Sequence, residues 1–245
     1  MKRFLTVLLL TAVLALGAET VLIRSAEEAV SSPHDNLRWG VPMLSDDITV
    51  IDREGFAVGF SRKHRIPMWV CYVLTREEVE AATQKRTERY AADKLLPESP
   101  QPADYRGSDF SRGHMAPALD MAFSAETLEE SFLMSNIAPQ LAGFNRGAWR
   151  QLETWIRKTA VLEKKLVIVT GVVIGPDRKT IAKNITVPDA FYKAILIPGP
   201  RRKVFCFLLK HSENAAPVSV SQKALEKLTG CTFFRKAAKK KTPEN

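Results

Sequence analysis

Short apolar runs of strand length constrain the fold of this chain more than any other feature of its sequence. Polar, turn-rich segments separate the runs, and the stretch from Asn145 to about Lys165 repeats large apolar residues at the helical spacings of three and four. Apolar residues make up 45% of the 245 residues, which is enough for one sizeable core. We therefore expect a single α+β domain with a mixed, largely antiparallel central sheet flanked by helices. The runs expected to form strands span residues 56–60, 68–74, 131–137, 166–171, 190–196 and 204–209.

Turn and capping residues add detail around these runs. Thr75 is followed three residues later by Glu78, a capping-box pattern that predicts a short helix after the second strand. Three prolines mark residues 97–108 as a loop, and Pro139 is expected to close the third strand. A last helix is expected over residues 219–228.

The N-terminus has the pattern of a secretory signal. Lys2 and Arg3 precede an apolar run from Phe4 to Leu16, and small residues follow. The run is shorter than the roughly 20 residues that a membrane-spanning helix needs. We therefore expect a secreted or periplasmic protein without stable membrane association after cleavage, and an uncleaved anchor is the alternative. The expected parts are a signal peptide at 1–18, a flexible leader at 19–36, a folded domain at 37–234 and a basic tail at 235–245.

Composition limits the partners and the cross-links of the chain. Lys and Arg number 36 against 27 Asp and Glu, and the formal net charge is +9. Such a surplus suits a polyanion such as DNA or RNA, although many basic proteins bind no nucleic acid. Three cysteines allow at most one intramolecular disulfide, and buried free thiols are the alternative. The cysteines are Cys71, Cys206 and Cys231.

One group of polar residues carries the chemistry. A histidine, an arginine, two carboxamides and a carboxylate fall within 43 residues. Cutting a phosphodiester requires a base for water, a cation for the charge on phosphorus and a group that stabilises the departing oxygen. His114 can be the base because imidazole titrates near neutral pH, Arg112 offers a charged fork to phosphate, and Gly113 would let a phosphate approach the backbone. Asn145 presents a neutral oxygen that suits Mg²⁺, and Glu153 lies about two helical turns further on, on roughly the same side.

Each of these residues also has an ordinary structural interpretation. A lone histidine in a loop is usually solvated or hydrogen-bonded, Asn145 could be a helix N-cap, and Glu153 could be a surface charge. Their joint occurrence at these spacings favours a site. We interpret Asp120, which follows the histidine motif, as a residue that fixes its loop. The histidines interpreted as structural are His34, His64 and His211.

Ordered blocks of the sequence resemble the DNA/RNA non-specific endonucleases, which are ββα-metal nucleases. Ser111-Arg112-Gly113-His114 resembles the Asp-Arg-Gly-His motif of that family. The similarity extends roughly over residues 37–210. The blocks that carry it are residues 39–42, 67–70, 104–117, 132–140 and 144–153.

The resemblance implies a role for each site residue. It implies that His114 is the general base, that Arg112 contacts the phosphate, and that Asn145 is the direct ligand of Mg²⁺, for which Mn²⁺ can substitute. It also implies that Glu153 acts in the water shell of the metal and that Asn136 supports the metal site.

The same resemblance implies a fold for the site and a reaction. One strand ends at His114, residues 131–137 form a second strand, and the helix that begins at Asn145 completes a ββα unit. The implied activity is that of a metal-dependent endonuclease that attacks DNA and RNA in line and leaves a 5′-phosphate and a 3′-hydroxyl. A homodimer is an expectation by analogy with relatives.

Two departures from the family pattern leave alternatives open. Ser111 replaces the usual aspartate, as in some endonuclease G-like relatives, so it supports the site without a carboxylate. Residues 72–74 lack an arginine that some secreted members carry there, and Arg76 is a candidate substitute. The alternatives are a nucleic-acid-binding protein with weak or no turnover and a 5′ exonuclease.

Overall fold

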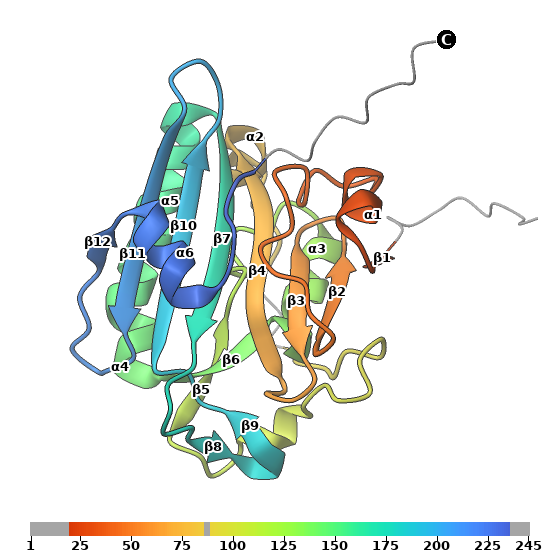
Figure 1. Cartoon of the computed structure of the whole chain (residues 1–245), viewed down its shortest axis with the longest axis vertical. Helices are drawn as coiled ribbons and strands as arrows, with labels where there is room; N and C mark the ends of the chain where they lie inside the picture. Colours follow the sequence, from red (N-terminus) through yellow and green to blue (C-terminus); the bar gives the residue numbers. More distant parts are fainter. Residues whose placement is uncertain (1–19, 86–88, 236–245) are drawn as a thin grey trace, which may run out of the picture.

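An eight-stranded sheet forms the centre of the computed structural model, which describes residues 20–85 and 89–235 (Figure 1). Every neighbouring pair of strands in it is antiparallel, so the expected α+β class and antiparallel sheet are confirmed. In spatial order the strands are β1 (Val21–Ile23), β2 (Ile48–Asp52), β3 (Ala57–Ser61), β4 (Ile66–Thr75), β7 (Lys165–Val173), β10 (Ala190–Ile197), β11 (Lys203–Lys210) and β12 (Val218–Val220).

Apolar cover on both faces explains why the central strands are nearly continuous apolar runs. Alternate residues of β7 and β10 enter two hydrophobic cores on opposite faces of the sheet. On one face, Trp69 lies over Gly59 and Tyr192 lies over Gly171, so a Cβ at either glycine would overlap an aromatic ring. Five of the six expected strands are therefore confirmed, at β3, β4, β7, β10 and β11.

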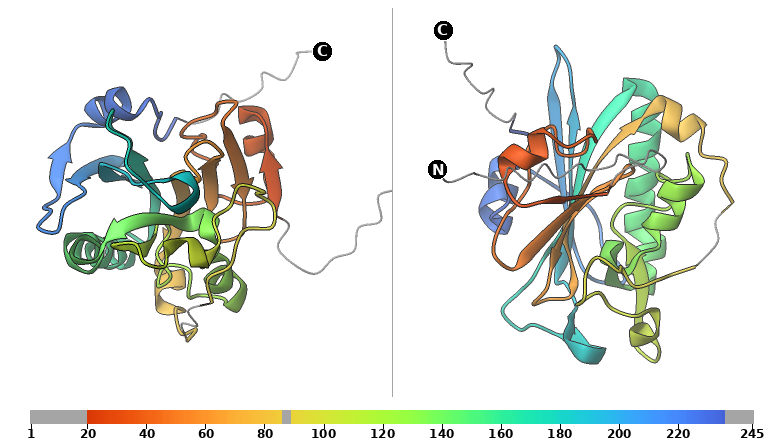
Figure 2. Two further views of the ribbon diagram at one scale, coloured as in Figure 1. Left: turned by 90° about the horizontal axis from the view of Figure 1, so that it is seen from below. Right: turned by 90° about the vertical axis from the view of Figure 1, so that its right-hand side faces the viewer.

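Helices cover both faces of the sheet (Figure 2). Thr75 and Glu78 form the expected capping box at the start of α2. Ser221 caps α6, which begins later than expected because the preceding residues pair with β11 as β12. On one face lie α2 (Arg76–Glu80), α3 (Ala125–Ser131) and α5 (Arg150–Glu163), and on the other lie α1 (Ala26–Val30) and α6 (Gln222–Thr229).

The expected flexible leader over residues 19–36 is corrected by the structure. Its described part pairs with β2 as β1 and then forms α1, which Ser25 caps. Asn36 is buried, and its amide donates to Asp52 Oδ1 (2.9 Å) and to the Arg53 carbonyl (2.7 Å). A three-residue strand and a five-residue helix carry too little periodicity for the sequence to reveal them. The expected signal peptide and, apart from Arg235, the expected basic tail lie outside the described residues.

A second, two-stranded sheet positions the site. It pairs β5 (Phe110–His114) with β6 (Ile137–Leu141) in antiparallel register, with His114 opposite Ile137. The chain then continues through α4 (Ala142–Phe144) and the π-turn η3 (Asn145–Trp149) into α5. The backbone is non-helical at Gly147, so this segment is one kinked helix. The ββα unit that the resemblance implied is present.

The second strand of this unit lies later in the chain than expected. Ser131 ends α3, and a 3-10 turn, η2 (Met134–Asn136), precedes β6. The side chain of Asn136 bonds to backbone groups, which favours a turn over a strand. Pro139 lies inside β6 rather than at its end, because each strand of a two-stranded sheet is an edge strand and tolerates proline.

All three cysteines are buried and free, so the alternative of buried thiols is confirmed. None of the helices formed by residues 20–85 and 89–235 is long and apolar enough to cross a membrane. The short elements are η1 (Pro102–Tyr105), β8 (Thr180–Ile181), η4 (Ala182–Asn184) and β9 (Ile185–Thr186).

Candidate active site

A cleft of about 780 Å³ lies between β5 and the kinked helix. It brings together Arg112 and His114 from β5 with Asn145 from η3 and Glu153 from α5. Ser111 also lines it. Five of the six predicted site residues therefore meet in one place, although they come from two separate blocks of the sequence.

Asn136, the sixth predicted residue, lies behind the cleft and is fully buried. Its Oδ1 accepts from the Ala116 backbone N–H (2.8 Å), and its Nδ2 donates to the carbonyls of Ala116 and Ser131 (2.9 Å each). The side chain thus fixes the backbone two residues after His114. Its contacts are with protein backbone, so its support of the site passes through the chain that carries the histidine.

Aromatic rings orient the two β5 side chains. The guanidinium carbon of Arg112 lies 4.2 Å from the ring centroid of Tyr90, a cation–π contact. The rings of Tyr90 and Phe132 lie 5.7 Å and 4.9 Å from the His114 ring. Tyr90 was not predicted from the sequence, because it lies outside the blocks and has no periodic partner.

Gly113 has a packing role that the sequence did not predict. It is buried, and a Cβ at this position would overlap the side chain of Gln140 on β6. The glycine is therefore required for packing within the β5–β6 hairpin, and the approach of a phosphate to its backbone stays a prediction.

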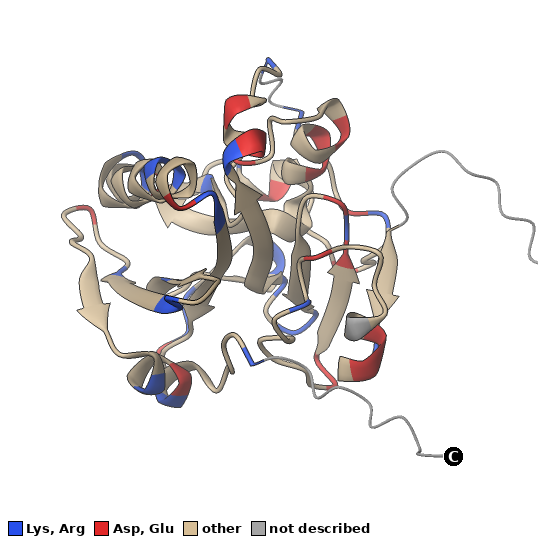
Figure 3. Cartoon of the chain, turned by 90° about the horizontal axis from the view of Figure 1, so that it is seen from above, with Lys and Arg blue, Asp and Glu red and all other residues tan. Residues whose placement is uncertain are grey.

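Four further arginines line the same cleft. Three of them lie with Glu153 along η3 and α5 at intervals of four, three and four residues, and all of these side chains line the cleft. That spacing is readable in the sequence. Acidic residues gather instead on the short helices α1, α2 and α3 (Figure 3), so the cleft presents positive charge to a polyanion. The further cleft arginines are Arg106, Arg146, Arg150 and Arg157.

Arg157 differs from the other cleft arginines because a buried carboxylate anchors it. Its Nη1 lies 2.9 Å from Asp120 Oδ1, and the Tyr72 hydroxyl donates to Asp120 Oδ2 (2.8 Å). Burial and the neighbouring Asp120 raise the pKa of Tyr72, which keeps its hydroxyl protonated as a donor. Asp120 thus has the loop-fixing contacts expected of it. Arg76 does not reach the cleft, since its Nε donates to the Val161 carbonyl (2.6 Å), and its proposed substitution for the missing arginine is corrected.

A buried lysine lies beneath Glu153. Lys193 is fully buried, its Nζ donates to Thr170 Oγ1 (2.8 Å) and lies 4.6 Å from the ring centroid of Trp149, and burial lowers its pKa. Burial raises the pKa of Glu153 to about 7, while the charge of Lys193 favours the ionised carboxylate. The two opposing effects leave this carboxyl sensitive to any further positive charge in the cleft.

The donor atoms of the cleft fit a hard, largely hydrated cation. Asn145 and Glu153 offer one carboxamide oxygen and one carboxylate. Among the described residues, no three His, Cys, Asp or Glu side chains form a group that could hold a metal ion. Mg²⁺ commonly keeps several waters and takes only one or two protein oxygens together with substrate phosphate, which suits this set.

Comparisons with known proteins agree with this geometry. Nuclease C1 of Cunninghamella echinulata var. echinulata is 29% identical to this chain over 222 residues, which cover 82% of this chain and 87% of that protein. The mitochondrial Nuclease 1 of Schizosaccharomyces pombe is 31% identical over 235 residues, with 82% and 72% covered. The crystal structure of the EndoG/EndoGI complex contains a chain that matches with a TM-score of 0.69 and 25% identity, over 83% of this chain and 91% of that one.

The family assignment rests on most of the length of the chain. Residues 37–240 match the model of the DNA/RNA non-specific endonucleases, and this span contains the ββα unit and the whole cleft. The chain therefore belongs to the DNA/RNA non-specific endonuclease family.

Proposed function

We propose that this chain is a Mg²⁺-dependent endonuclease that cuts both DNA and RNA and leaves 5′-phosphate products, with Mn²⁺ as a substitute metal. Its family makes it a nuclease, and the proposal adds the metal, the sugar non-specificity, the products and the residue roles. One observation carries it. The β5 residues Arg112 and His114 meet the oxygen ligands of the helical segment in one arginine-rich cleft.

His114 is assigned the role of general base. Its imidazole takes a proton from the attacking water, and the rings of Tyr90 and Phe132 hold it at one orientation during that transfer. Arg112 binds a non-bridging oxygen of the scissile phosphate through its guanidinium, which Tyr90 keeps pre-oriented. Ser111 lines the cleft beside them and adds no charge.

Asn145 and Glu153 are assigned to the metal. Asn145 would bind Mg²⁺ through its carboxamide oxygen, and Glu153 would hold water in its shell. When bound, Mg²⁺ would supply positive charge to the phosphate as charge develops in the transition state. Asn136 maintains the backbone between His114 and the turn that precedes β6, so its contribution is to positioning.

Arg157 is assigned to the departing oxygen. It lines the cleft, its Nη1 contacts Asp120, which accepts from Tyr72, and its Nη2 donates to Thr154 Oγ1 (3.4 Å), so its guanidinium is pre-organised. In this assignment, Arg157 on α5 supplies the charge for which residues 72–74 lack an arginine and for which Arg76 was a candidate.

The test uses covalently closed circular DNA and a single-stranded RNA. The purified protein should degrade both with Mg²⁺ or Mn²⁺ and neither with EDTA, and His114→Ala should lose cleavage while its thermal unfolding stays cooperative. His64→Ala is the matched control, because His64 is also half-buried and lies outside the cleft with its Nδ1 3.1 Å from Thr186 Oγ1. Full activity in His114→Ala would overturn the assigned mechanism.

The same substrates separate the two alternatives. Binding of both nucleic acids without cleavage under every divalent metal would favour a binding protein, and cleavage of linear but not circular DNA would favour a 5′ exonuclease. The location that we propose, secreted or periplasmic, is supported only by the sequence of residues 1–18.

A further inference from the structure

His211 joins three parts of the molecule at the edge of the catalytic unit. It follows β11 directly, and its backbone N–H donates to the Asp189 carbonyl (2.8 Å). Its half-buried ring packs edge-to-face against Phe144 (5.2 Å) and Phe191 (5.1 Å), and its centroid lies 5.9 Å from that of Phe110. The ring is thus enclosed by β5, β10 and α4.

Both ring nitrogens of His211 bond to backbone atoms of fixed polarity. The Leu141 N–H donates to Nε2 (2.8 Å), and Nδ1 lies 2.8 Å from the Pro188 carbonyl oxygen. An amide N–H can only donate and a carbonyl can only accept, so Nε2 must be unprotonated and Nδ1 must carry the proton. The two bonds therefore require one tautomer of the neutral ring. Burial lowers the pKa of His211, which favours the same neutral form.

The bond to Leu141 lies at the joint of the catalytic unit. Leu141 is the last residue of β6, where it pairs with Phe110, and it immediately precedes α4. Asn145 lies four residues further on, and Phe144, next to it, packs on the same His211 ring. The helical segment leaves the hairpin at Leu141. His211 therefore holds the backbone N–H at the point that sets the direction of this segment.

A second contact from the same loop supports this assignment. Glu213 covers Gly143 in α4 so closely that a Cβ there would overlap its carboxylate. The loop after β11 therefore contacts the turn before Asn145 through two separate residues, although this loop lies about 70 residues away in the sequence.

We propose that His211 is a positioning residue, which places Asn145 relative to His114 by holding the β6–α4 joint through the Leu141 N–H. This inference rests on the metal-binding role assigned to Asn145 above. His211 itself does not line the cleft, so it touches neither substrate nor metal.

Two amide substitutions separate the two bonds of the ring. The amide of His211→Gln can reach the place of Nε2 and accept from Leu141, whereas that of His211→Asn can reach only the place of Nδ1 and bond to Pro188. We expect His211→Gln to keep kcat within about threefold of wild type and His211→Asn to lose about tenfold to a hundredfold, since a displacement of about 1 Å at a reacting group can cost that much. KM for DNA should be unchanged in both variants, because the cleft arginines are intact.

A second readout avoids cleavage altogether. Without nucleic acid, Mg²⁺ should raise the Tm of wild type and of His211→Gln, and His211→Asn should need a higher Mg²⁺ concentration for the same rise. His64→Asn is the control and should behave as wild type in both measurements. Equal kcat values for His211→Asn and His211→Gln, or an unchanged Mg²⁺ response in His211→Asn, would overturn the positioning role. Absence of metal-dependent cleavage by wild type would instead overturn the proposed function.

Discussion

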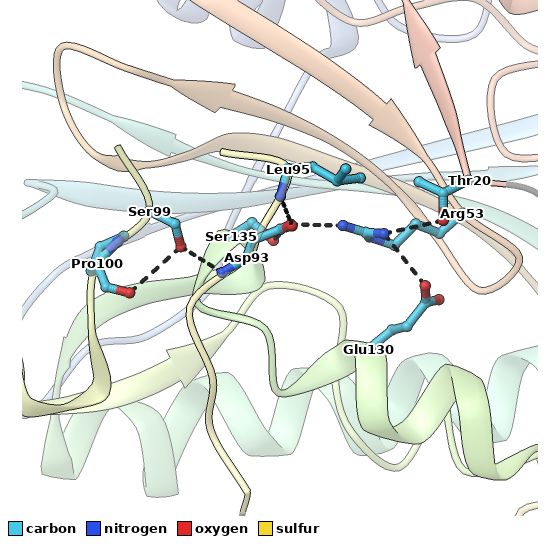
Figure 4. Close-up of polar contacts among 8 residues, drawn as sticks. All are labelled: Thr20, Arg53, Asp93, Leu95, Ser99, Pro100, Glu130 and Ser135. Atoms are coloured by element: carbon cyan, nitrogen blue, oxygen red, sulfur yellow. Dashed lines mark hydrogen bonds and ion pairs between the residues drawn. The ribbon is translucent and has the colours of Figure 1, made fainter. Parts of the chain in front are cut away.

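Two buried aspartates each bind an arginine, and the two pairs differ in what surrounds the arginine. Arg53 Nη2 lies 2.7 Å from Asp93 Oδ2, and the two side chains are only 5% and 2% exposed (Figure 4). Arg157 Nη1 lies 2.9 Å from Asp120, which is fully buried, but the arginine itself is 17% exposed and lines the cleft. The same type of ion pair is therefore closed, that is buried on all sides, at Arg53 and Asp93, whereas at Arg157 and Asp120 it is open to the cleft.

The closed pair belongs to a network that joins separate parts of the fold. Arg53 also contacts Glu130 (3.4 Å), and Asp93 accepts from the Ser135 hydroxyl (2.6 Å) (Figure 4). Ser135 precedes Asn136, which holds the backbone two residues after His114. Burial on all sides makes the first pair a structural joint, whereas the open side of the second pair leaves Arg157 facing the cleft.

The largest effect should follow from breaking the closed pair. Asp93→Ala leaves Arg53 buried with only the longer contacts to Glu130 (3.4 Å) and Thr20 (3.3 Å), so we expect a loss of about 3–5 kcal/mol in the free energy of unfolding. Urea denaturation measures this loss. The paired variant Arg53→Met with Asp93→Leu removes both charges and should recover much of the stability, and a loss below about 1 kcal/mol in Asp93→Ala would contradict the role of the network.

Removing the open arginine should reduce catalysis more than stability. For Arg157→Met we expect a fall in kcat of about 10²–10³-fold, because a pre-organised donor to developing charge is lost. Stability should fall less than in Asp93→Ala, since Asp120 keeps its bond to Tyr72. Single-turnover cleavage of a short duplex measures the chemical step. Arg106→Met is the matched comparison: it removes an exposed cleft arginine and should act mainly on KM, and an equal fall in kcat would remove the distinction between the two arginines.

The smallest effect should come from an exposed pair. Lys165 Nζ lies 3.1 Å from Asp35 Oδ2, and its hydrogen bond and charge lower the pKa of Asp35 below its usual 3.8. The native state then binds fewer protons than the unfolded state, so the stabilisation is full above about pH 4 and is lost as pH falls further. Because both groups are well exposed, we expect Asp35→Asn to cost only about 0.2–1 kcal/mol near pH 7 and progressively less as the pH falls below about 4, in urea titrations at each pH. A loss as large as that of Asp93→Ala would contradict the comparison.

Local patterns in the sequence predicted most of the strands and the residue types of the cleft. They failed where an element is very short or where side-chain hydrogen bonds determine the path of the backbone. The runs at β3, β4, β7, β10 and β11 were predictable because apolar residues on both faces produce long continuous signals. The strand at β6 was misplaced because Asn136 turns the chain by bonding to its backbone, which no periodicity reveals. The strand β1 in the described part of the leader was not predicted, because it has only three residues. It is stabilised by pairing with β2 and not by a pattern of its own.

The sequence by itself determined which side chains are available for the reaction and in which order they occur along the chain. Only the tertiary structure decided that Arg157 and not Arg76 faces the cleft, that Tyr90 orients both β5 side chains, and that His211 holds the joint before Asn145. The physical reason is distance along the chain. Periodicity and capping are local and can be read from neighbouring residues, whereas each of these contacts forms only after the sheet has brought remote segments together.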